Sequence, residues 1–129
     1  MNIDFQLLIK EATRIVGDFK TIGCVTFGGV GAAILSSSGN VFSGVCVDAA
    51  CGIGFCAEHA AIAEMLKNKQ YEILACVAVE TSGKPVPPCG RCREFMYQLS
   101  PKNLNAKIMI SITEVVSLRD LLPHAWAYD

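Results

Sequence analysis

Three cysteines and one glutamate have the types and the spacing of a metal site. Glu58 stands two positions after Cys56, and Cys89 and Cys92 stand three positions apart. Three thiolates can hold a zinc ion and leave its fourth position open, as catalytic zinc sites do. A carboxylate beside such an ion can move protons while the ion activates a water molecule. We therefore predict zinc bound by the three cysteines, with Glu58 as the catalytic acid and base.

Both cysteine groups are expected to open a helix directly after a loop. The free N–H groups and the positive dipole end of a helix start stabilise a thiolate, which is the form that binds metal. Residues from about 56 to 68 are rich in Ala, Met and Leu, and residues 90–99 carry Phe95 and Leu99 at an inward spacing. Two helices that start side by side would bring the three sulfur atoms together.

Other interpretations of these residues remain open. Cys89 and Cys92 alone would also suit half of a structural zinc site, a redox pair or two core cysteines. His59 or His124 could supply a fourth ligand and close the site. Glu58 alone would suit the first turn of a helix, where the dipole favours acids. The full set favours catalysis, because a structural zinc site has no need of a carboxylate at that place.

The remaining cysteines and the N-terminus indicate the compartment. The chain has seven cysteines, an odd number, and its first residues are not a basic start followed by an apolar block. We therefore expect no signal peptide, no disulfide framework and a reducing, cytoplasmic location. Cys24, Cys51 and Cys76 are expected to be small buried apolar residues. No apolar stretch approaches the roughly 20 residues that cross a bilayer, so no membrane partner is expected.

Composition narrows the class of partner. The 129 residues are expected to form one domain over residues 1–129, and 52% of them are apolar. This high apolar fraction favours a covered subunit interface in a homo-oligomer. The net charge is −1 and no basic run is present, whereas a polyanion binder usually carries a basic face. The expected partner is a small molecule and not a nucleic acid polymer.

The pattern of apolar residues predicts an α/β fold with three layers, α-β-α, around a mixed five-stranded sheet. Apolar spacings of three and four predict a helix over residues 3–19. Ser117 and Asp120 fit a capping box, so residues 117–122 are expected to form a short helix. The continuous apolar run 73–79 predicts a central strand covered on both faces. The other strands are expected at residues 30–36, 41–47, 106–112 and 115–116.

Several segments resemble the cytidine deaminase family, including its blasticidin-S deaminase branch: CAE at 56–58, PCGRCR at 88–93, GAA at 31–33, GNVFSG at 39–44 and LLP at 121–123. The resemblance implies a cytidine deaminase-like fold and zinc-dependent hydrolysis. The implied reaction converts a free cytosine nucleoside, such as cytidine or deoxycytidine, to its uracil form with release of ammonia. It also implies a homotetramer that works in pyrimidine salvage.

The resemblance implies further roles around the metal. Backbone groups near Ala57 and Pro87 would contact the reacting end of the base. Arg93 would hydrogen bond to a ligand sulfur and offset the negative charge of three thiolates. An arginine often follows the Cys-Ala-Glu motif in the family, and here that place is His59. His59 would take the same part or be an ordinary helix histidine.

Substrate contacts away from the metal depart from the family. Relatives grip the ribose with Asn-x-Glu on the second strand, and the corresponding place here is Cys46-Val47-Asp48. Asp48 can still accept a hydrogen bond from a sugar hydroxyl, whereas the Cys46 thiol is a weak donor and acceptor. The alternative is that Cys46 packs and Asp48 caps the loop.

Aromatic residues are expected against the base. Phe27 stands near the family's base-stacking aromatic, and Trp126, followed by Tyr128, stands where a phenylalanine closes the pocket, often that of a neighbouring subunit. Stacking on a flat base suits such rings, and plain packing is the alternative.

The missing asparagine leaves the substrate open. It weakens the case for ordinary cytidine and leaves room for a modified cytosine nucleoside, an isomeric base or the nucleoside antibiotic blasticidin S. A different class is a non-catalytic, zinc-stabilised binding module. A polynucleotide editor is disfavoured by the charge.

Overall fold

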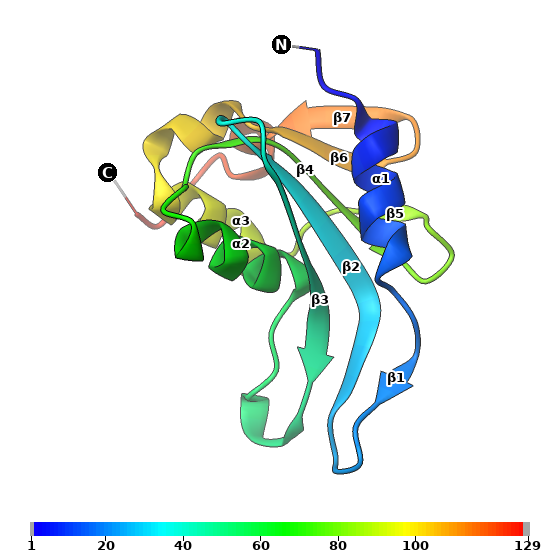
Figure 1. The fold of residues 1–129 in the computed structure, drawn as a ribbon. Helices are drawn as coiled ribbons and strands as arrows, with labels where there is room; N and C mark the ends of the chain where they lie inside the picture. The colour runs from blue at the N-terminus through cyan, green and yellow to red at the C-terminus, as the bar shows by residue number, and fades with distance from the viewer. Residues whose placement is uncertain (1, 128–129) are drawn as a thin grey trace.

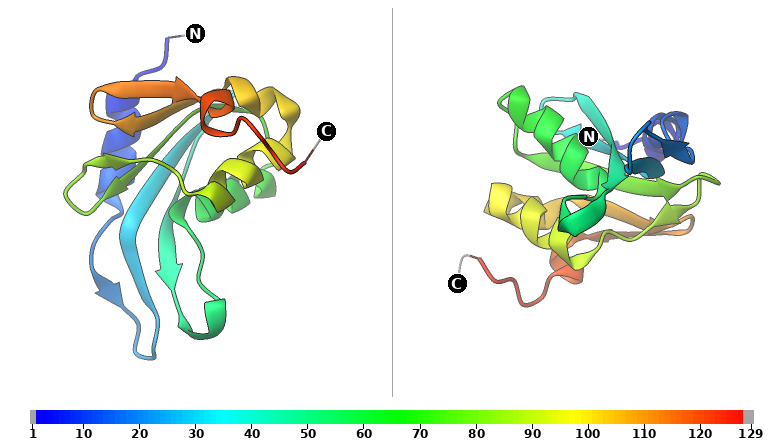
Figure 2. Two further views of the ribbon diagram at one scale, coloured as in Figure 1. Left: turned by 180° about the vertical axis from the view of Figure 1, so that it is seen from behind. Right: turned by 90° about the horizontal axis from the view of Figure 1, so that it is seen from below.

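The computed structural model describes residues 2–127 and has helices on both faces of one mixed sheet (Figure 1). The expected three-layer α-β-α fold is confirmed. Within the described residues the helices are α1 (Phe5–Arg14), α2 (Ala57–Lys67), α3 (Gly90–Leu99) and α4 (Leu118–Leu121). Helix α1 covers one face of the sheet, and α2 and α3 cover the other, as the view from below shows (Figure 2).

The described part of the sheet has seven strands: β1 (Phe19–Lys20), β2 (Thr26–Ser36), β3 (Val41–Asp48), β4 (Ile73–Glu80), β5 (Pro85–Val86), β6 (Lys107–Ser111) and β7 (Glu114–Ser117). Their order is β1-β2-β4-β6-β7, while β3 pairs with β2 and β5 pairs with β4. Only β4 and β6 pair in parallel, which makes the sheet mixed. The five expected strands are present, and the two additional ones are only two residues long, too short to show any periodicity.

The expectation of a helix over residues 3–19 is wrong at its C-terminal end. Asp4 caps α1, which ends at Arg14. Glycine disfavours helix by about 1 kcal/mol, and the N–H of Gly17 donates to the carbonyl of Gly28 at 2.9 Å. Phe19 then pairs with Phe27 across β1 and β2, and their ring centroids lie 5.3 Å apart. Pairing with a distant strand therefore overrides the local apolar spacing.

Other local expectations are confirmed. Residues 90–99 form α3, and Ser117 and Asp120 form the expected capping box at the start of α4. Two connections contain short 3-10 helices, Ala50–Gly52 and Pro101–Asn105. The apolar residues of these connections show no regular spacing that would predict them.

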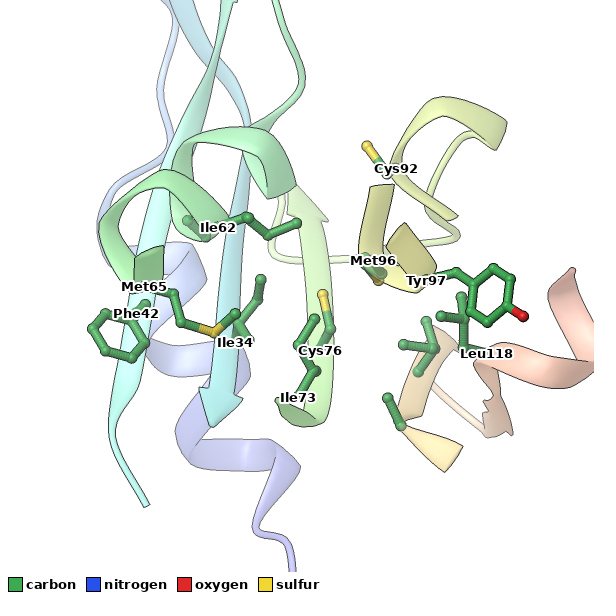
Figure 3. Close-up of a cluster of buried hydrophobic side chains, with 13 residues drawn as sticks. Ile34, Phe42, Ile62, Met65, Ile73, Cys76, Cys92, Met96, Tyr97 and Leu118 are labelled. Atoms are coloured by element: carbon green, nitrogen blue, oxygen red, sulfur yellow. The ribbon is translucent and has the colours of Figure 1, made fainter. Parts of the chain in front are cut away.

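Both faces of the sheet are buried, as expected for residues 73–79. On β2, Ala33 belongs to the cluster beneath α1, and the next residue, Ile34, belongs to the cluster beneath α2 and α3. On β4, Val77 and Cys76 alternate in the same way. Figure 3 shows the second cluster, in which α2 and α3 pack on the sheet. The core thus fixes the two helices whose first residues carry the cysteines.

All seven cysteines are free. Cys76 is buried as expected, but Cys24 and Cys51 are exposed, so that part of the expectation is wrong. Cys24 lies in the turn between β1 and β2, and Cys51 lies in a loop with a positive φ of 60°. Neither position has a neighbouring element to cover it. No helix among the described residues has the length and apolar character needed to cross a membrane.

Asn103 joins the site-bearing helix to the sheet. Its carboxamide is fully buried, accepts from the N–H of Ile73 at 2.7 Å, and donates to the carbonyls of Tyr71 and Met96 at 3.0 and 2.9 Å. The end of α3 is therefore tied to the start of β4. An amide that satisfies three buried backbone groups is costly to remove, since each unpaired group costs about 1–3 kcal/mol.

Candidate metal centre

Three sulfur atoms meet at the starts of α2 and α3. Cys56 is the N-cap residue of α2, Cys89 is the N-cap residue of α3, and Cys92 lies in the first turn of α3. The sulfur of Cys89 lies 3.5 Å from that of Cys56 and 3.5 Å from that of Cys92. The sulfur of Cys89 thus lies between the other two, in the space shared by the two helix starts.

The electrostatics of the three thiols differ. Burial raises the pKa of Cys56 and Cys92 above the usual value for a thiol. Burial acts in the same direction on Cys89, but the backbone N–H groups of Cys92 and Arg91 and the two neighbouring thiols outweigh it and lower its pKa. Without a cation, one thiolate is favoured and the other two are not. A divalent ion would compensate the charge of the remaining two, so this donor set fits zinc.

No fourth protein ligand completes the cluster in residues 2–127. The ligand atoms of Cys56, Cys89 and Cys92 all lie within 4.8 Å of one another, and no histidine or carboxylate of the described chain joins the group. His59 and His124, the two candidates for a closed site, are therefore outside it. The arrangement leaves a coordination position for water or substrate, as catalytic zinc sites do.

Glu58 is buried next to the sulfurs, with only 4% of its surface exposed. It lines a cavity of about 160 Å³ together with Cys56 and Cys89. Burial raises the pKa of its carboxyl, partly offset by its own backbone N–H and by the Cys92 thiol. A raised pKa makes this carboxyl group a better proton acceptor than an exposed one, which suits a general acid and base.

His59 contacts a proposed ligand. Its Nδ1 lies 3.4 Å from the sulfur of Cys92, and its ring lies 4.9 Å from that of Phe95 at a tilt of 35°. Burial, and then the positive charge of Arg91, lower the pKa of His59. The ring is thus favoured in its neutral form, which can present an N–H to the sulfur. This contact suits support of the metal ligands, one of the two roles that the sequence leaves open for His59.

Arg93 lies beside the site but bonds to backbone carbonyls. Its Nε donates to the carbonyl of Pro88 at 2.8 Å, and its Nη1 donates to the carbonyl of Leu121 at 3.2 Å. The sequence expectation was a bond to a ligand sulfur. The guanidinium instead holds the residue before Cys89 and the last residue of α4, so it orients the ligand loop indirectly.

Two adjoining cavities lead away from the sulfurs. The inner one, of about 160 Å³, is lined by Cys46, Ala57, Glu58 and Pro87 along with two of the ligand cysteines. The outer cavity has a volume of about 660 Å³, and Cys46, Asp48, Cys56 and Arg91 are among its lining residues. The sequence-predicted residues Cys46, Ala57, Pro87 and Asp48 thus line these two neighbouring cavities, which have Val30, Cys46 and Cys56 in common.

Two sequence-predicted residues lie outside the inner and the outer cavity. Phe27 borders a separate cavity of about 310 Å³, which shares Gly29 and Asp48 with the outer one. Trp126 lines neither cavity, is 83% exposed, and its backbone N–H donates to Glu94 at 2.8 Å. Tyr128 lies outside the described residues.

Two features of the site were missed by sequence reasoning. The sulfur of Cys46 accepts a hydrogen bond from the N–H of Val30 at 3.2 Å, next to an irregularity in the β2–β3 pairing. No local sequence pattern predicts this hydrogen bond between Val30 and Cys46. Arg91 lines the outer cavity, and its place between two cysteine ligands could have suggested this. A residue on the first turn of α3 must lie close to the sulfurs on either side of it.

Comparison with known proteins agrees with this geometry. The cytidine and deoxycytidylate deaminase zinc-binding region matches residues 7–108. A cytidine deaminase from Halalkalibacterium halodurans is 31% identical over 127 residues, covering 96% of this chain and 95% of the relative. A blasticidin-S deaminase from Bacillus cereus is 32% identical over 105 residues, covering 70% of this chain and 75% of the relative.

Solved structures extend the similarity to the fold. The crystal structure of cytidine deaminase from Mycobacterium tuberculosis superposes with a TM-score of 0.83 at 28% identity, over 98% of this chain and all of the other. A mutant of that enzyme gives a TM-score of 0.84 at 29% identity, covering 99% and 98% of the two chains.

Fold and cysteine cluster together define a hydrolytic deaminase domain with a zinc-binding region. This chain belongs to the cytidine and deoxycytidylate deaminase family. Zinc is accordingly the cofactor, and Cys56, Cys89 and Cys92 form the cluster that can hold it.

Proposed function

We propose that this protein deaminates a free cytosine nucleoside by zinc-dependent hydrolysis, giving the uracil nucleoside and ammonia. The observation that carries the proposal is the buried Glu58 beside a three-sulfur cluster with no fourth protein ligand among residues 2–127. A structural zinc site would be closed and would have no use for a buried carboxyl group. The relatives named cytidine deaminase support the same substrate class.

Zinc, when bound by the three sulfurs, supplies a Lewis acid that makes water nucleophilic at neutral pH. Glu58 accepts a proton from the attacking water and passes it to the ring nitrogen, and then carries the second proton, that of the new hydroxyl group, to the departing amine. The bond between the ring carbon and the exocyclic nitrogen breaks, the water oxygen takes its place, and ammonia leaves. The inner cavity, between Ala57 and Pro87, holds the reacting end of the base.

Residues around the ligands orient this machinery. His59 holds the sulfur of Cys92, and Arg93 fixes the carbonyl of Pro88, directly before Cys89. Such supporting contacts typically change metal affinity or activity by about 10- to 100-fold when removed. Both residues are therefore positioning residues in the proposed mechanism.

Blasticidin S is the second candidate substrate. The relative from Bacillus cereus is named for it, and the sugar-side residues Cys46 and Asp48 differ from the Asn-x-Glu of ordinary cytidine deaminases. The Cys46 sulfur already accepts a hydrogen bond from the N–H of Val30, so it is a poor hydrogen-bond partner for a sugar hydroxyl. A substrate with a modified sugar would lose less by this change than cytidine.

The direct experiment incubates the purified, zinc-loaded protein with cytidine, deoxycytidine, blasticidin S and isocytosine and follows ammonia release. Turnover of cytidine or deoxycytidine supports nucleoside salvage, and selective turnover of blasticidin S supports the antibiotic. A zinc-loaded protein that turns over none of them would instead be a non-catalytic binding module.

We further propose that the protein works as a homotetramer in the cytoplasm. Large apolar side chains are strongly exposed on the described chain, among them Leu7, Ile22, Ile53 and Trp126. A homo-oligomer would cover such side chains, and their exposure in the single chain supports the proposal. In such an assembly Trp126 would close the pocket of a neighbouring subunit. Light scattering that gave a monomer mass at micromolar concentration would contradict the proposal.

A further inference from the structure

Among residues 2–127, the outer cavity is lined by one positively charged side chain, Arg91, which makes no ion pair with another described residue. Arg91 lies at the start of α3 and lines this cavity together with Asp48, the last residue of β3. Among residues 2–127 the single ion pair joins Arg14 and Glu11, so Arg91 has no carboxylate within salt-bridge distance. An exposed guanidinium with five donors and no acceptor is free to bind an incoming oxyanion.

The nearest acid on the same helix is already engaged. Glu94 lies one turn after Arg91, and both border a hollow on the surface of α3. The carboxylate of Glu94 accepts the N–H groups of Trp126 and Ala127 at 2.8 and 3.4 Å, and the amide of Gln98 at 3.1 Å. Its oxygens are thus used to hold the C-terminal segment. Arg91 keeps its charge available on the side of the outer cavity.

The outer cavity is also larger than a base-binding site requires. Its volume of about 660 Å³ is about four times the 160 Å³ of the inner cavity, where Glu58 and the sulfurs lie. Asp48 and Arg91 are the acidic and the basic residue of its lining. A ligand group placed there has both a carboxylate acceptor and a guanidinium donor in the lining of the cavity.

We propose that Arg91 is a specificity-determining residue that binds an oxyanion attached to the sugar of the substrate. This inference rests on the proposed function, because it assumes that a cytosine base occupies the inner cavity. The sugar then extends into the outer cavity, with its hydroxyls toward Asp48 and an anionic substituent toward Arg91. A phosphate and a carboxylate share this chemistry, since a guanidinium binds either with two parallel hydrogen bonds.

The kinetic experiment compares a neutral substrate with two anionic ones. Deoxycytidine is the neutral nucleoside, deoxycytidine 5′-phosphate carries a phosphate, and blasticidin S carries a carboxylate on its sugar. We expect the wild-type protein to prefer at least one anionic substrate in kcat/KM. In Arg91→Gln the ratio of anionic to neutral kcat/KM should fall about tenfold, or about 1.4 kcal/mol, mainly through KM.

Matched variants separate a local contact from general charge. Arg119→Gln removes the same charge from exposed α4, away from both cavities, and should leave the ratio unchanged. Arg91→Lys should keep part of the preference, because it keeps the charge but loses the paired geometry. An equal fall in Arg91→Gln and Arg119→Gln would overturn the inference, and so would a ratio that Arg91→Gln leaves unchanged.

Binding without turnover separates this inference from the proposed function. Calorimetric titration with deoxyuridine and with deoxyuridine 5′-phosphate should show tighter binding of the phosphate, and Arg91→Gln should remove the difference. Deamination without any dependence on Arg91 would support the proposed function and contradict the inference. Phosphate-dependent binding through Arg91 without deamination would support the inference and contradict the proposed function. Binding of neither ligand would overturn the inference.

Discussion

At the scale of single residues, the environment of a side chain decides what it can do. Glu58 and Glu11 are both helix acids, but burial raises the pKa of Glu58, whereas a hydrogen bond from Arg14 lowers that of Glu11. Only the buried carboxyl lies next to the sulfurs. Sequence spacing predicted Glu58 and the three cysteines, because each stands at a helix start with a recognisable motif.

Glu58→Gln should keep zinc and lose nearly all deaminase activity. The amide has the shape of the carboxyl group but cannot take a proton from water, so a loss of at least 100-fold is expected for a missing general base (about 10²–10⁴). Metal content measured by mass spectrometry, alongside ammonia release, checks both parts. A variant that stayed active would show that another group moves the proton.

His59→Ala should weaken zinc binding by about 10- to 100-fold, because a contact that orients a ligand sulfur is removed. Competition with a chromogenic chelator measures the affinity directly, without any activity assay. His124→Ala is the matched control, since His124 lines a separate cavity with Tyr97 and Leu122 that contains none of the three cysteines. Equal zinc affinity in the two variants would make His59 an ordinary helix residue.

At the scale of elements, local signals predicted α3 and the capping box of α4 well, whereas contacts between distant segments stayed hidden. The end of α1, the two-residue strands β1 and β5, and the carbonyl contacts of Arg93 all depend on partners far along the chain. Asn103 is the clearest case, since nothing in its neighbourhood marks it as a junction between β4 and α3. Pairing geometry and buried polar contacts of this kind come from the whole fold.

Gly44→Ala should destabilise the protein by about 1–3 kcal/mol, as overpacking usually does. A Cβ atom at Gly44 would lie 2.5 Å from the Cβ of Ala60 and 2.5 Å from the N of Ala61, so β3 and α2 would have to separate. Because α2 begins at Cys56, weaker zinc binding should accompany the loss. Urea denaturation measures the free energy of unfolding. Gly90→Ala, at a position with open space, is the control and should be nearly neutral.

At the scale of the whole molecule, the metal ligands come from two connections that are 33 positions apart, one after β3 and one after β5. A bound ion therefore links the starts of α2 and α3 on one face of the sheet. Anything that binds only the folded state stabilises it, by about 2.7 kcal/mol at a hundredfold excess over Kd. Zinc is thus expected to contribute to folding as well as to chemistry.

Removal of zinc by a chelator should lower the Tm by several degrees, and added zinc should restore it. Differential scanning calorimetry measures the shift. In Cys92→Ser the Tm should not change when zinc is added or removed. In Cys24→Ser, at an exposed turn, the Tm should still change. If the Tm of a zinc-loaded sample did not change on chelation, zinc would not contribute to the stability of the fold.

The two guanidinium bonds of Arg93 have a practical consequence for handling the protein. They join the carbonyl before Cys89 to that of Leu121, close to the C-terminal segment that Glu94 holds. We expect a purification tag or a fusion partner at that end to disturb the ligand loop more than one at the other end, which precedes α1 on the opposite face of the sheet. N-terminal fusions are therefore the safer choice for assays.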